Sequence, residues 1–371
     1  MKKVLILGVA SVQMDAVLQL KEMKCETFTC AMAKDGPAAD VSDHFEIINI
    51  LDENMLIEYI KKNSIDVVYS TGSDLAMPIA CRISEKLGMP HFVSSQTAYA
   101  CNHKNEMRLR LSTCKGNIPF KVAETLEDIK DMSMHYPLIL KPSDSQGQRG
   151  IFLVTSDDEI IKYFNEAKKY SREGKVIIEK YIDGPEISVN GYMVNGKLEY
   201  MMVSDRDTWP EYTGLIHKHI IPAQTLEIGT NQKIRNIFQE ACNCLGILNG
   251  PAYFQIKLEN QTPYIIEMTP RLDGCHMWNL LNRATGINLM KLVFEHLLYN
   301  DVSELKRQDS TVKPMELVFF CQKPNLIMDC SSYSVPEDAV DSFFYYRTGD
   351  YVRPVNGKFD KVGYYIHNLR E

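Results

Sequence analysis

The sequence predicts an α/β lobe followed by a larger α+β region, and three features carry this prediction. Over about the first 95 residues, short apolar runs alternate with helical patterns, which is typical of a doubly wound sheet. Residues 252–258 and 264–271 alternate like strands on either side of a polar turn, which predicts a hairpin. Strand-like alternation returns in residues 316–321, 342–347 and 363–368, which predicts a small antiparallel C-terminal lobe.

The totals describe an ordinary soluble protein of two or three lobes. Its 371 residues are 45% hydrophobic and 24% charged, and the net charge of −7 gives no reason to expect nucleic-acid binding. No run approaches the roughly 20 apolar residues of a membrane helix. The start Met1-Lys2-Lys3 imitates a signal peptide, but Asp15 follows and we interpret this segment as a first buried strand. Ten cysteines without a Cys-x-x-Cys pair indicate free thiols in a reducing, cytoplasmic setting.

The N-terminal lobe is predicted element by element. Its first turn, from Gly8 to Ser11, lacks the Gly-x-Gly-x-x-Gly pattern of dinucleotide-binding folds, which argues against NAD. Its last helix has a clear stop signal in Gly88 and Pro90. The expected strands are 4–9, 27–30, 45–50 and 67–69, and the expected helices are 16–23, 56–62 and 74–87.

A basic helix and a polar loop follow. Residues 102–111 carry Lys104, Arg108 and Arg110, for which a solvated basic face is the simplest interpretation. Residues 119–182 resemble a small α+β subdomain, in which a strand ends at Lys141-Pro142 and leads into the loop 143–150. Glycines in that loop permit positive φ, so successive N–H groups can surround an anion, and Lys141 supplies a point charge for phosphate. Taken by itself, the loop is better explained as an ordinary hairpin loop, because glycine and serine are common in turns.

The middle of the chain contains a broken strand and a hairpin. Residues 175–182 form a strand that Asp183-Gly184-Pro185 interrupts, and Asn195-Gly196 marks a hairpin turn between residues 192 and 203. Residues 205–222 are predicted to be irregular. His217 and His219 have no third ligand within sequence reach, so they do not predict a zinc site.

The predicted hairpin of residues 252–271 brings an amide and an acid together. A turn centred on Gln261 places Gln255 opposite Glu267, and directly opposed Cβ atoms lie about 5 Å apart, close enough to share one cation. Glu267 and Thr269 point to the same face, and Arg271 continues that face. A slip of one residue would destroy this arrangement.

These stretches together resemble the ATP-grasp superfamily, above all the carbamoyl-phosphate-synthase large chain and related carboxylate–amine ligases. The resemblance covers about residues 1–300 and is densest at 141–150, 179–188 and 255–274. The family usually reads Glu-x-Asn-x-Arg, and Thr269 replaces the asparagine here. The implied fold is a preATP-grasp, Rossmann-like lobe at 1–95, an ATP-grasp domain at 96–300 with a mobile lid at about 119–182, and a small C-terminal lobe at 301–371.

The resemblance also implies the ligands and the residues that bind them. ATP is expected with Mg²⁺, or alternatively Mn²⁺, held by Gln255, Glu267 and Thr269. The other residues implied for nucleotide binding are Lys104, Lys141, Gln146, Gly147 and Gly150 at the phosphates, Glu179, Lys180, Tyr181 and Ile182 at the adenine, and Glu186 at the ribose.

The activity implied is that of an ATP-dependent carboxylate–amine ligase. A carboxylate would attack the γ-phosphate of ATP, and an amine would then displace phosphate from the acylphosphate, with Arg271 and Lys141 as catalytic residues. Small-molecule carboxylate and amine partners follow, a homodimer is compatible with the family, and loops 206–222 and 274–279 would set specificity. A carboxylase that activates bicarbonate and a non-catalytic ATP-binding protein remain as alternatives, the latter because of Thr269.

Overall fold

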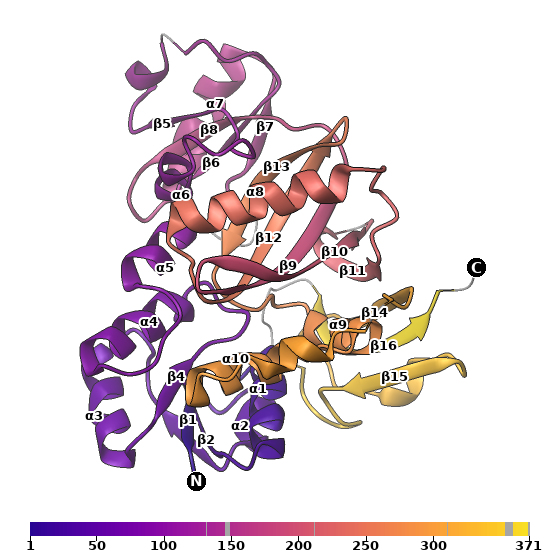
Figure 1. Cartoon of the computed structure of the whole chain (residues 1–371). Coiled ribbons are helices and arrows are strands. Elements are labelled where there is room, and N and C mark those ends of the chain that lie inside the picture. The colour runs from indigo at the N-terminus through magenta and orange to yellow at the C-terminus, as the bar shows by residue number, and fades with distance from the viewer. Residues whose placement is uncertain (131, 145–148, 211, 310, 353–358, 370–371) are drawn as a thin grey trace.

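The computed structural model shows an N-terminal lobe, a small lid and a large sheet packed together (Figure 1). It describes all of residues 1–371 except 131, 145–148, 211, 310, 353–358 and 370–371. Among the described residues, no helix is both long enough and apolar enough to cross a bilayer.

The N-terminal lobe is built on a four-stranded parallel sheet of order β3-β2-β1-β4. Residues Val4 to Leu7 of its central strand are completely buried, as expected for a parallel strand covered on both faces. The chain runs outward from β1 to β3 and returns on the other side of β1, so the strand order reverses between β1 and β4. The strands are β1 (Lys3–Leu7), β2 (Glu26–Ala31), β3 (His44–Ile47) and β4 (Val67–Tyr69).

Helices connect and cover these strands, which confirms the predicted alternation. Asp52 caps α3 by accepting a hydrogen bond from the Met55 amide, and Gly88 ends α4 in the left-handed conformation with φ 64°, as its sequence predicts. The helices of this region are α1 (Ser11–Glu22), α2 (Ala38–Val41), α3 (Glu53–Asn63), α4 (Ala76–Leu87), α5 (Ser95–Asn102) and α6 (Lys104–Arg110).

The lid is a separate four-stranded sheet of order β5-β8-β6-β7 backed by helix α7. Helix α7 (Asp157–Lys169) begins at the Ser156 cap, and its buried residues Ile160, Phe164 and Ala167 recur at helical spacing against the sheet. Figure 1 shows the lid projecting from the rest of the molecule. Its other elements are β5 (Phe120–Ala123), η1 (Leu126–Ile129), β6 (Leu138–Pro142), β7 (Phe152–Val154) and β8 (Val176–Lys180).

An eight-stranded sheet of order β13-β12-β9-β10-β11-β14-β16-β15 forms the centre of the molecule. The turn between β9 and β10 has positive φ at Asn195 and Gly196, which confirms the predicted hairpin. Helix α8 lies across this sheet, while α9 and α10 lie between it and the N-terminal lobe (Figure 1). The strands are β9 (Glu186–Val194), β10 (Lys197–Trp209), β11 (Tyr212–Ile221), β12 (Gly250–Glu259), β13 (Thr262–Thr269), β14 (Met315–Gln322), β15 (Ala339–Phe344) and β16 (Asp360–Asn368); the helices are α8 (Thr230–Leu245), α9 (Met277–Thr285), α10 (Leu289–Tyr299), η2 (Ser303–Arg307) and η3 (Cys330–Ser332).

The structure differs from the sequence prediction over residues 205–222. Most of the described residues in this stretch are not irregular, because β10 runs on to Trp209 and pairs with β11, with register shifts between Asp207 and Trp209. Polar residues such as Arg206 and His219 take buried positions on this strand pair, which hides the usual apolar period from sequence reasoning.

The C-terminal residues are β-rich as predicted, and their strands extend the large sheet. Strand β14 pairs with β11, so that Lys218 lies opposite Val318, and β16 and β15 continue outward from it. The C-terminal strands therefore share a sheet with the strands that carry the predicted site residues.

Gly184, between the last lid strand β8 and β9, is the first position at which we predict a measurable effect. Its φ is 142°, and an added Cβ would lie 1.9 Å from the carbonyl oxygen of Leu258. We expect Gly184→Ala to lower the free energy of unfolding by about 1–3 kcal/mol in urea titrations, because backbone strain of this kind has that magnitude. Gly174→Ala is the control: its φ of 68° is also positive, but the nearest atom to its Cβ is 3.7 Å away. An equal loss in both variants would contradict the close approach to Leu258.

Candidate active site

The strand pair β12–β13 has the predicted pairing at Gln255, although the register shifts by one residue between Gln255 and Ile256, on the side toward the turn. Gln255 lies directly opposite Glu267, and Ser188 of β9 lies opposite Gln255 on the other side. Directly paired residues share a face of the sheet, so the amide and the carboxylate lie side by side. The predicted pairing of these two residues is confirmed.

The polar side chains around Gln255 fit a magnesium–nucleotide complex. The amide nitrogen Nε2 of Gln255 donates to Oε1 of Glu186 at 2.6 Å, which leaves the amide oxygen of Gln255 for other contacts. Mg²⁺ takes oxygen ligands, commonly one or two carboxylates together with substrate phosphates, and Glu267 with Gln255 offers this kind of set. Within the described part of the chain, no three His, Cys, Asp or Glu side chains gather as a metal site.

Glu186, which the family resemblance assigns to the ribose, contacts both Gln255 and Arg206. It accepts from Gln255 and forms an ion pair with Arg206, whose Nη1 lies 2.6 Å from Oε1 of Glu186. Arg206 is mostly buried, so this loop candidate reaches into the site. Of the other loop candidates, His217 packs against Trp209 in a tilted arrangement, with 4.0 Å between ring centroids, and Lys218 pairs with Asp207 and Glu316.

The N-terminal lobe supplies an acid that sequence reasoning missed. Asp74 accepts hydrogen bonds from the Thr269 hydroxyl at 3.2 Å and from Nε of Arg271 at 2.8 Å. Nη1 of Arg271 also donates to the Leu272 carbonyl at 2.9 Å. Thr269 and Arg271 are thus held together at one end of β13, and Asp74 is about 200 residues distant in sequence, so no local pattern could reveal it.

A buried cluster of three charges joins the lid to β13. Glu179 of β8 is paired through one oxygen with Nε of Arg108 at 2.8 Å and through the other with Nζ of Lys141 at 2.7 Å. Arg108 also donates to the backbone carbonyls of Ile265 at 2.6 Å and Ile266 at 3.1 Å. Arg108 belongs to the helix that the sequence interprets as a solvated basic face, but its side chain is completely buried.

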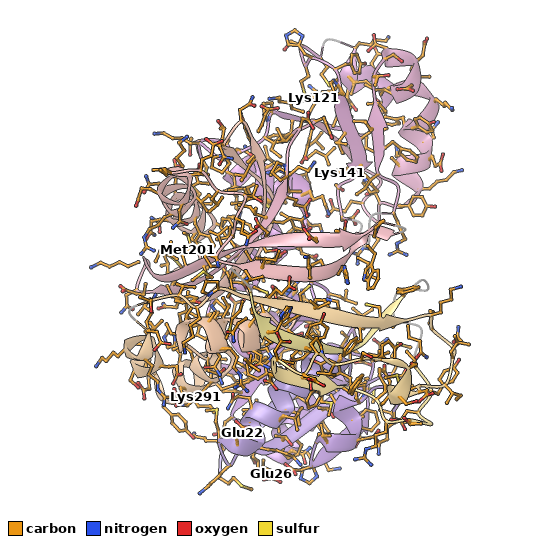
Figure 2. The ribbon with its side chains drawn as sticks, turned by 90° about the vertical axis from the view of Figure 1, so that its right-hand side faces the viewer. Glu22, Glu26, Lys121, Lys141, Met201 and Lys291 are labelled. Carbon is orange, nitrogen blue, oxygen red and sulfur yellow. The ribbon has the colours of Figure 1, made fainter. Side chains whose placement is uncertain are left out.

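The cluster carries more positive than negative charge. Burial alone would raise the pKa of Glu179, but Arg108 and then Lys141 outweigh that effect and lower it to about 2. Burial lowers the pKa of Lys141, Arg108 and Lys104 lower it further, and Glu179 opposes them. Two cations share one carboxylate at the base of the lid, where Figure 2 labels Lys141, so the surplus charge favours an anion nearby.

The segment predicted to bind adenine connects the lid to β12. Nζ of Lys180 pairs with Glu259 at 2.6 Å, and Nζ of Lys257 donates to the Ile182 carbonyl at 3.1 Å and lies 5.1 Å from the centroid of the Tyr181 ring. Lys180, Tyr181 and Ile182 therefore border the large sheet next to the Gln255–Glu267 pair.

The predicted phosphate loop is anchored on both sides. Gln146 and Gly147, and the predicted mobility of the loop, lie outside the described residues. Gly150 has φ 72°, and a Cβ there would lie 2.6 Å from the Tyr170 ring. At the start of the loop, the Lys104 amide donates to the Ser143 carbonyl at 2.9 Å.

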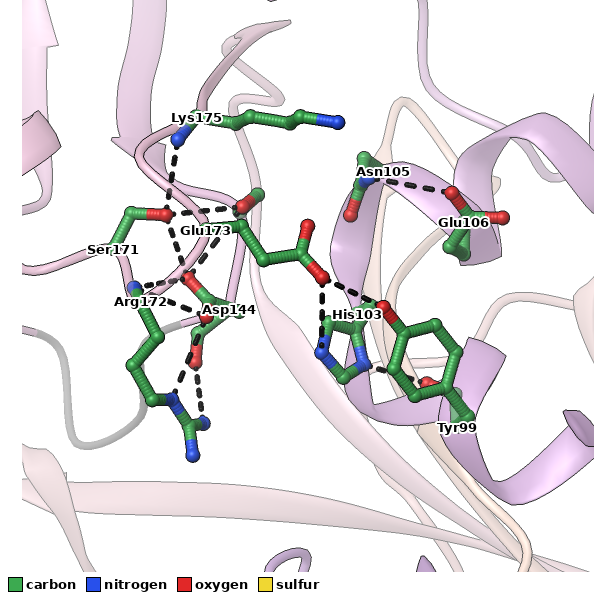
Figure 3. Close-up of polar contacts among 10 residues, drawn as sticks. Tyr99, His103, Asn105, Glu106, Asp144, Ser171, Arg172, Glu173 and Lys175 are labelled. Atoms are coloured by element: carbon green, nitrogen blue, oxygen red, sulfur yellow. Dashed lines mark hydrogen bonds and ion pairs between the residues drawn. The ribbon is translucent and has the colours of Figure 1, made fainter. Parts of the chain in front are cut away.

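Figure 3 shows how a neighbouring loop of the lid holds this anchor. Asp144 accepts from the Arg172 amide at 3.1 Å and the Ser171 hydroxyl at 2.7 Å. Glu173 accepts from the Tyr99 hydroxyl at 2.6 Å and lies 3.5 Å from Nε2 of His103, so the lid also contacts helix α5. Glu173 raises the pKa of Tyr99 to about 12, chiefly through this hydrogen bond.

A cavity of about 360 Å³ opens beside the end of β13. It lies where the N-terminal lobe, the large sheet and the C-terminal strands meet. Of its lining residues, only Leu215 and Gly274 belong to the loops that were expected to set specificity. Its lining residues are Ala10, Ser11, Val12, Gln13, Gly72, Ser73, Leu215, Gly274, Tyr346, Asp360 and Lys361.

Comparison with known proteins shows which proteins this chain resembles. Residues 134–278 match the ATP-grasp domain family. The chain is 25% identical over 358 residues to the C-terminal section of the carbamoyl phosphate synthase large chain from Methanocaldococcus jannaschii, covering 88% of this chain and 56% of that protein. It is 26% identical over 306 residues to alanine–anticapsin ligase from Bacillus subtilis, covering 73% of this chain and 62% of that protein.

A solved structure agrees over almost the entire chain. The biotin carboxylase domain of the Hydrogenobacter thermophilus 2-oxoglutarate carboxylase superposes with a TM-score of 0.81 at 16% identity, covering 99% of this chain and 86% of that one. The chain has the ATP-grasp fold, and the predicted resemblance to the carbamoyl-phosphate-synthase large chain is confirmed. The chain spans less than two thirds of the length of the two curated relatives.

The buried charge cluster leads to a prediction about stability. We expect Glu179→Gln to lower the free energy of unfolding at pH 7 by about 3–5 kcal/mol, because it leaves Arg108 and Lys141 buried without a counter-charge. Glu53→Gln is the matched control: Glu53 also pairs with an arginine and a lysine, Arg82 and Lys86, but at the surface, so a loss of about 1 kcal/mol or less is expected.

The pH dependence of the same variant follows from the lowered pKa of Glu179. The ion pairs stabilise the fold fully above the ordinary glutamate pKa of 4.5 and lose their effect as the pH falls toward the folded-state value of about 2. The difference between wild type and Glu179→Gln should therefore shrink between these two pH values in denaturant titrations. A difference that stays constant down to the lower value would contradict the ionised, paired state of Glu179.

Proposed function

We propose that this protein is an ATP-dependent carboxylate–amine ligase that forms an acylphosphate and releases ADP and phosphate. The observation that carries the proposal is the strand pair β12–β13, which aligns Gln255 with Glu267 and continues to Arg271. The similarity of the chain to alanine–anticapsin ligase and to the carbamoyl phosphate synthase large chain also supports a ligase.

ATP with Mg²⁺, or Mn²⁺, would bind between the lid and the large sheet. Glu267 and Gln255 would hold the metal, with Thr269 contributing its hydroxyl oxygen if the metal displaces its contact with Asp74. The metal ion would neutralise charge on the phosphates when bound. The solved biotin carboxylase domain is a complex with MgADP, which supports this nucleotide.

The protein groups would position and neutralise rather than react. The Arg108–Glu179–Lys141 cluster, with Lys104, would attract the phosphates, and the loop around Gly150 would cover them. Glu179, Lys180, Tyr181 and Ile182 would border the adenine, and Glu186 would bind the ribose after releasing Gln255 or Arg206. Arg271, already oriented by Asp74, would steady the transferring phosphoryl group.

One enzyme would be formed by three parts: the preATP-grasp lobe at 1–95, the ATP-grasp domain at 96–300 and the C-terminal lobe at 301–371. It would act in the cytoplasm on small-molecule carboxylate and amine substrates. A homodimer belongs to the same proposal, and it is supported by the solved biotin carboxylase domain, which was crystallised as a dimer.

A carboxylase that activates bicarbonate is the second candidate. The observation that favours it is that the same solved biotin carboxylase domain is in complex with the bicarbonate anion. A non-catalytic ATP-binding protein would also be consistent with Thr269 already hydrogen-bonded to Asp74.

Two site variants test the assignment. We expect Glu267→Gln and Arg271→Ala each to lower turnover at least ~10-fold, because each removes charge that would act on the transferring phosphoryl group. Arg283→Ala is the matched control, since Arg283 also pairs with an aspartate, Asp341, but at a half-exposed position. Circular dichroism should show all three variants folded, and near-normal turnover in both site variants would refute the assignment.

The substrate screen distinguishes the candidate functions. Phosphate release from Mg-ATP is measured against pools of amino acids and small carboxylic acids, with and without hydroxylamine, which traps an acylphosphate as a hydroxamate. Release that depends on one carboxylate, with hydroxamate formed, would support the ligase and identify the donor. ADP formation with bicarbonate alone would support the carboxylase, and ATP binding without release from any pool would support the non-catalytic protein.

A further inference from the structure

The segment that follows β13 and the strands β14 and β16 bring three nucleophilic side chains together, those of Cys275, Cys321 and Lys361. Lys361 lies directly opposite Cys321 in the β14–β16 pair, so these two side chains share a face of the sheet. Nζ of Lys361 donates a hydrogen bond to Sγ of Cys275 at 3.2 Å. None of the three residues belongs to the proposed nucleotide or metal site, so the proposed function gives them no role.

Cys275 differs from other thiols of the chain in what its sulfur contacts. Burial raises the pKa of Cys30 and Cys101 to about 12, which keeps those thiols protonated and inert. Cys330 is partly exposed, and its Sγ donates to the Tyr346 carbonyl at 3.5 Å. Cys275 is also partly exposed, but its sulfur accepts a hydrogen bond from an ammonium group. A lysine beside a cysteine favours the thiolate, which is the form that peroxides oxidise.

The ammonium group of Lys361 contacts both this sulfur and an aromatic ring. Its Nζ lies 3.8 Å from the centroid of the Phe319 ring, a distance typical of a cation–π contact. Lys361 also lines the cavity beside β13. Because Cys275 is partly exposed and Lys361 borders a cavity, a small oxidant can reach the pair.

Cys321 is the other thiol near Lys361, but it is poorly suited to react. Burial raises its pKa to about 11, although the charge of Lys361 lowers it. Attack on an oxidised sulfur requires a thiolate, so a thiol that stays protonated is a poor attacking group. Once the sulfur of Cys275 is oxidised, Nζ of Lys361 is therefore the group placed to attack it.

The backbone on both sides of this contact is held in place. Asp273 accepts a hydrogen bond from the Cys275 amide at 3.0 Å. The next residue, His276, is buried, and its Nδ1 contacts the Asp15 carboxylate of α1. Lys361 belongs to β16, which pairs with β14 on one side and with β15 on the other. The sulfur and the nitrogen are thus kept close to each other, which favours a reaction between them.

We propose that Cys275 is an oxidation site of this protein, and that hydrogen peroxide joins its sulfur to Nζ of Lys361 in a reversible covalent bridge. The proposal goes beyond the proposed ligase function and does not depend on it.

The bridge forms in two steps. The sulfur of Cys275 bonds to one oxygen of hydrogen peroxide and the O–O bond breaks; the departing hydroxide takes a proton from the Lys361 ammonium and leaves as water. This step gives a sulfenic acid and a neutral amine. The amine nitrogen then bonds to the sulfur, and the S–O bond breaks as the hydroxide departs with a proton from the nitrogen. In total the sulfur is oxidised and the peroxide is reduced to two molecules of water.

The bridge ties the segment after β13 to strand β16. Gly274, next to Cys275, and Lys361 both line the cavity beside β13. Oxidation therefore links two walls of this cavity, and a thiol such as dithiothreitol, which reduces the S–N bond, separates them again.

The experiment maps the oxidised residues of the full chain by mass spectrometry. Wild type, Lys361→Met and the control Lys218→Met are reduced, treated with hydrogen peroxide in the presence or absence of dimedone, which traps sulfenic acids, and then digested. Methionine keeps much of the apolar length of lysine and removes its nitrogen. Lys218 is a matched control, because it is also a partly buried lysine of the large sheet but pairs with Asp207 and Glu316.

We expect a cross-linked peptide pair that joins Cys275 to Lys361 and is lighter than the two free peptides by two hydrogen atoms. It should form in wild type and in Lys218→Met, disappear with dithiothreitol, and be absent from Lys361→Met. The dimedone adduct of Cys275 should be at least ~10-fold more abundant in Lys361→Met than in wild type, because a neighbouring nucleophile outcompetes a reagent in solution.

The wild-type protein alone can overturn the proposal, so the test does not depend on the folding of a variant. No cross-link between Cys275 and Lys361 in wild type, or a disulfide between Cys275 and Cys321 in its place, would overturn it. Equal dimedone adducts on Cys275 in wild type and in a folded Lys361→Met would also overturn it. The measurement needs no substrate, so its result is separate from that of the ligase assay.

Discussion

The arrangement of the site depends on one interaction, the pairing of the buried Glu179 carboxylate with Arg108 and Lys141. It joins helix α6, two lid strands and, through Arg108, the backbone of β13 in one buried contact. A lone buried charge would be strongly unfavourable, and three charges with a positive surplus are tolerated because each has partners. The same surplus makes the junction between lid and sheet attractive to phosphate. One cluster therefore serves both the packing of the lid and the electrostatics proposed for ATP binding.

Two further carboxylates connect the N-terminal lobe to the end of β13. Asp74 orients Arg271 and Thr269, and Asp15 orients His276 and Trp278. Both acids come from segments that follow strands of the first sheet: Asp15 lies in α1, after β1, and Asp74 lies between β4 and α4. The lobe thus supports the segment that follows β13 and also supplies one wall of the cavity.

The large sheet brings together residues with very different roles. Its strands β12 and β13 carry the proposed metal ligands, β10 brings Arg206 to Glu186, and β16 brings Lys361 to the cavity. Since β14 pairs with β11, the C-terminal strands are continuous with the site strands. The C-terminal region therefore helps to enclose the cavity beside β13.

The sequence by itself determined the elements whose signals are local. The alternation of residues 252–271 predicted the pairing of Gln255 with Glu267, and Asn195-Gly196 predicted a turn that requires positive φ. Residues 205–222 were misjudged because buried polar side chains such as His219 conceal the strand period. Only the tertiary structure revealed the contacts of Asp74 and the buried state of Arg108. Local patterns report backbone conformation, whereas burial and charge pairing depend on residues that are distant in sequence and meet only when the lobes pack together.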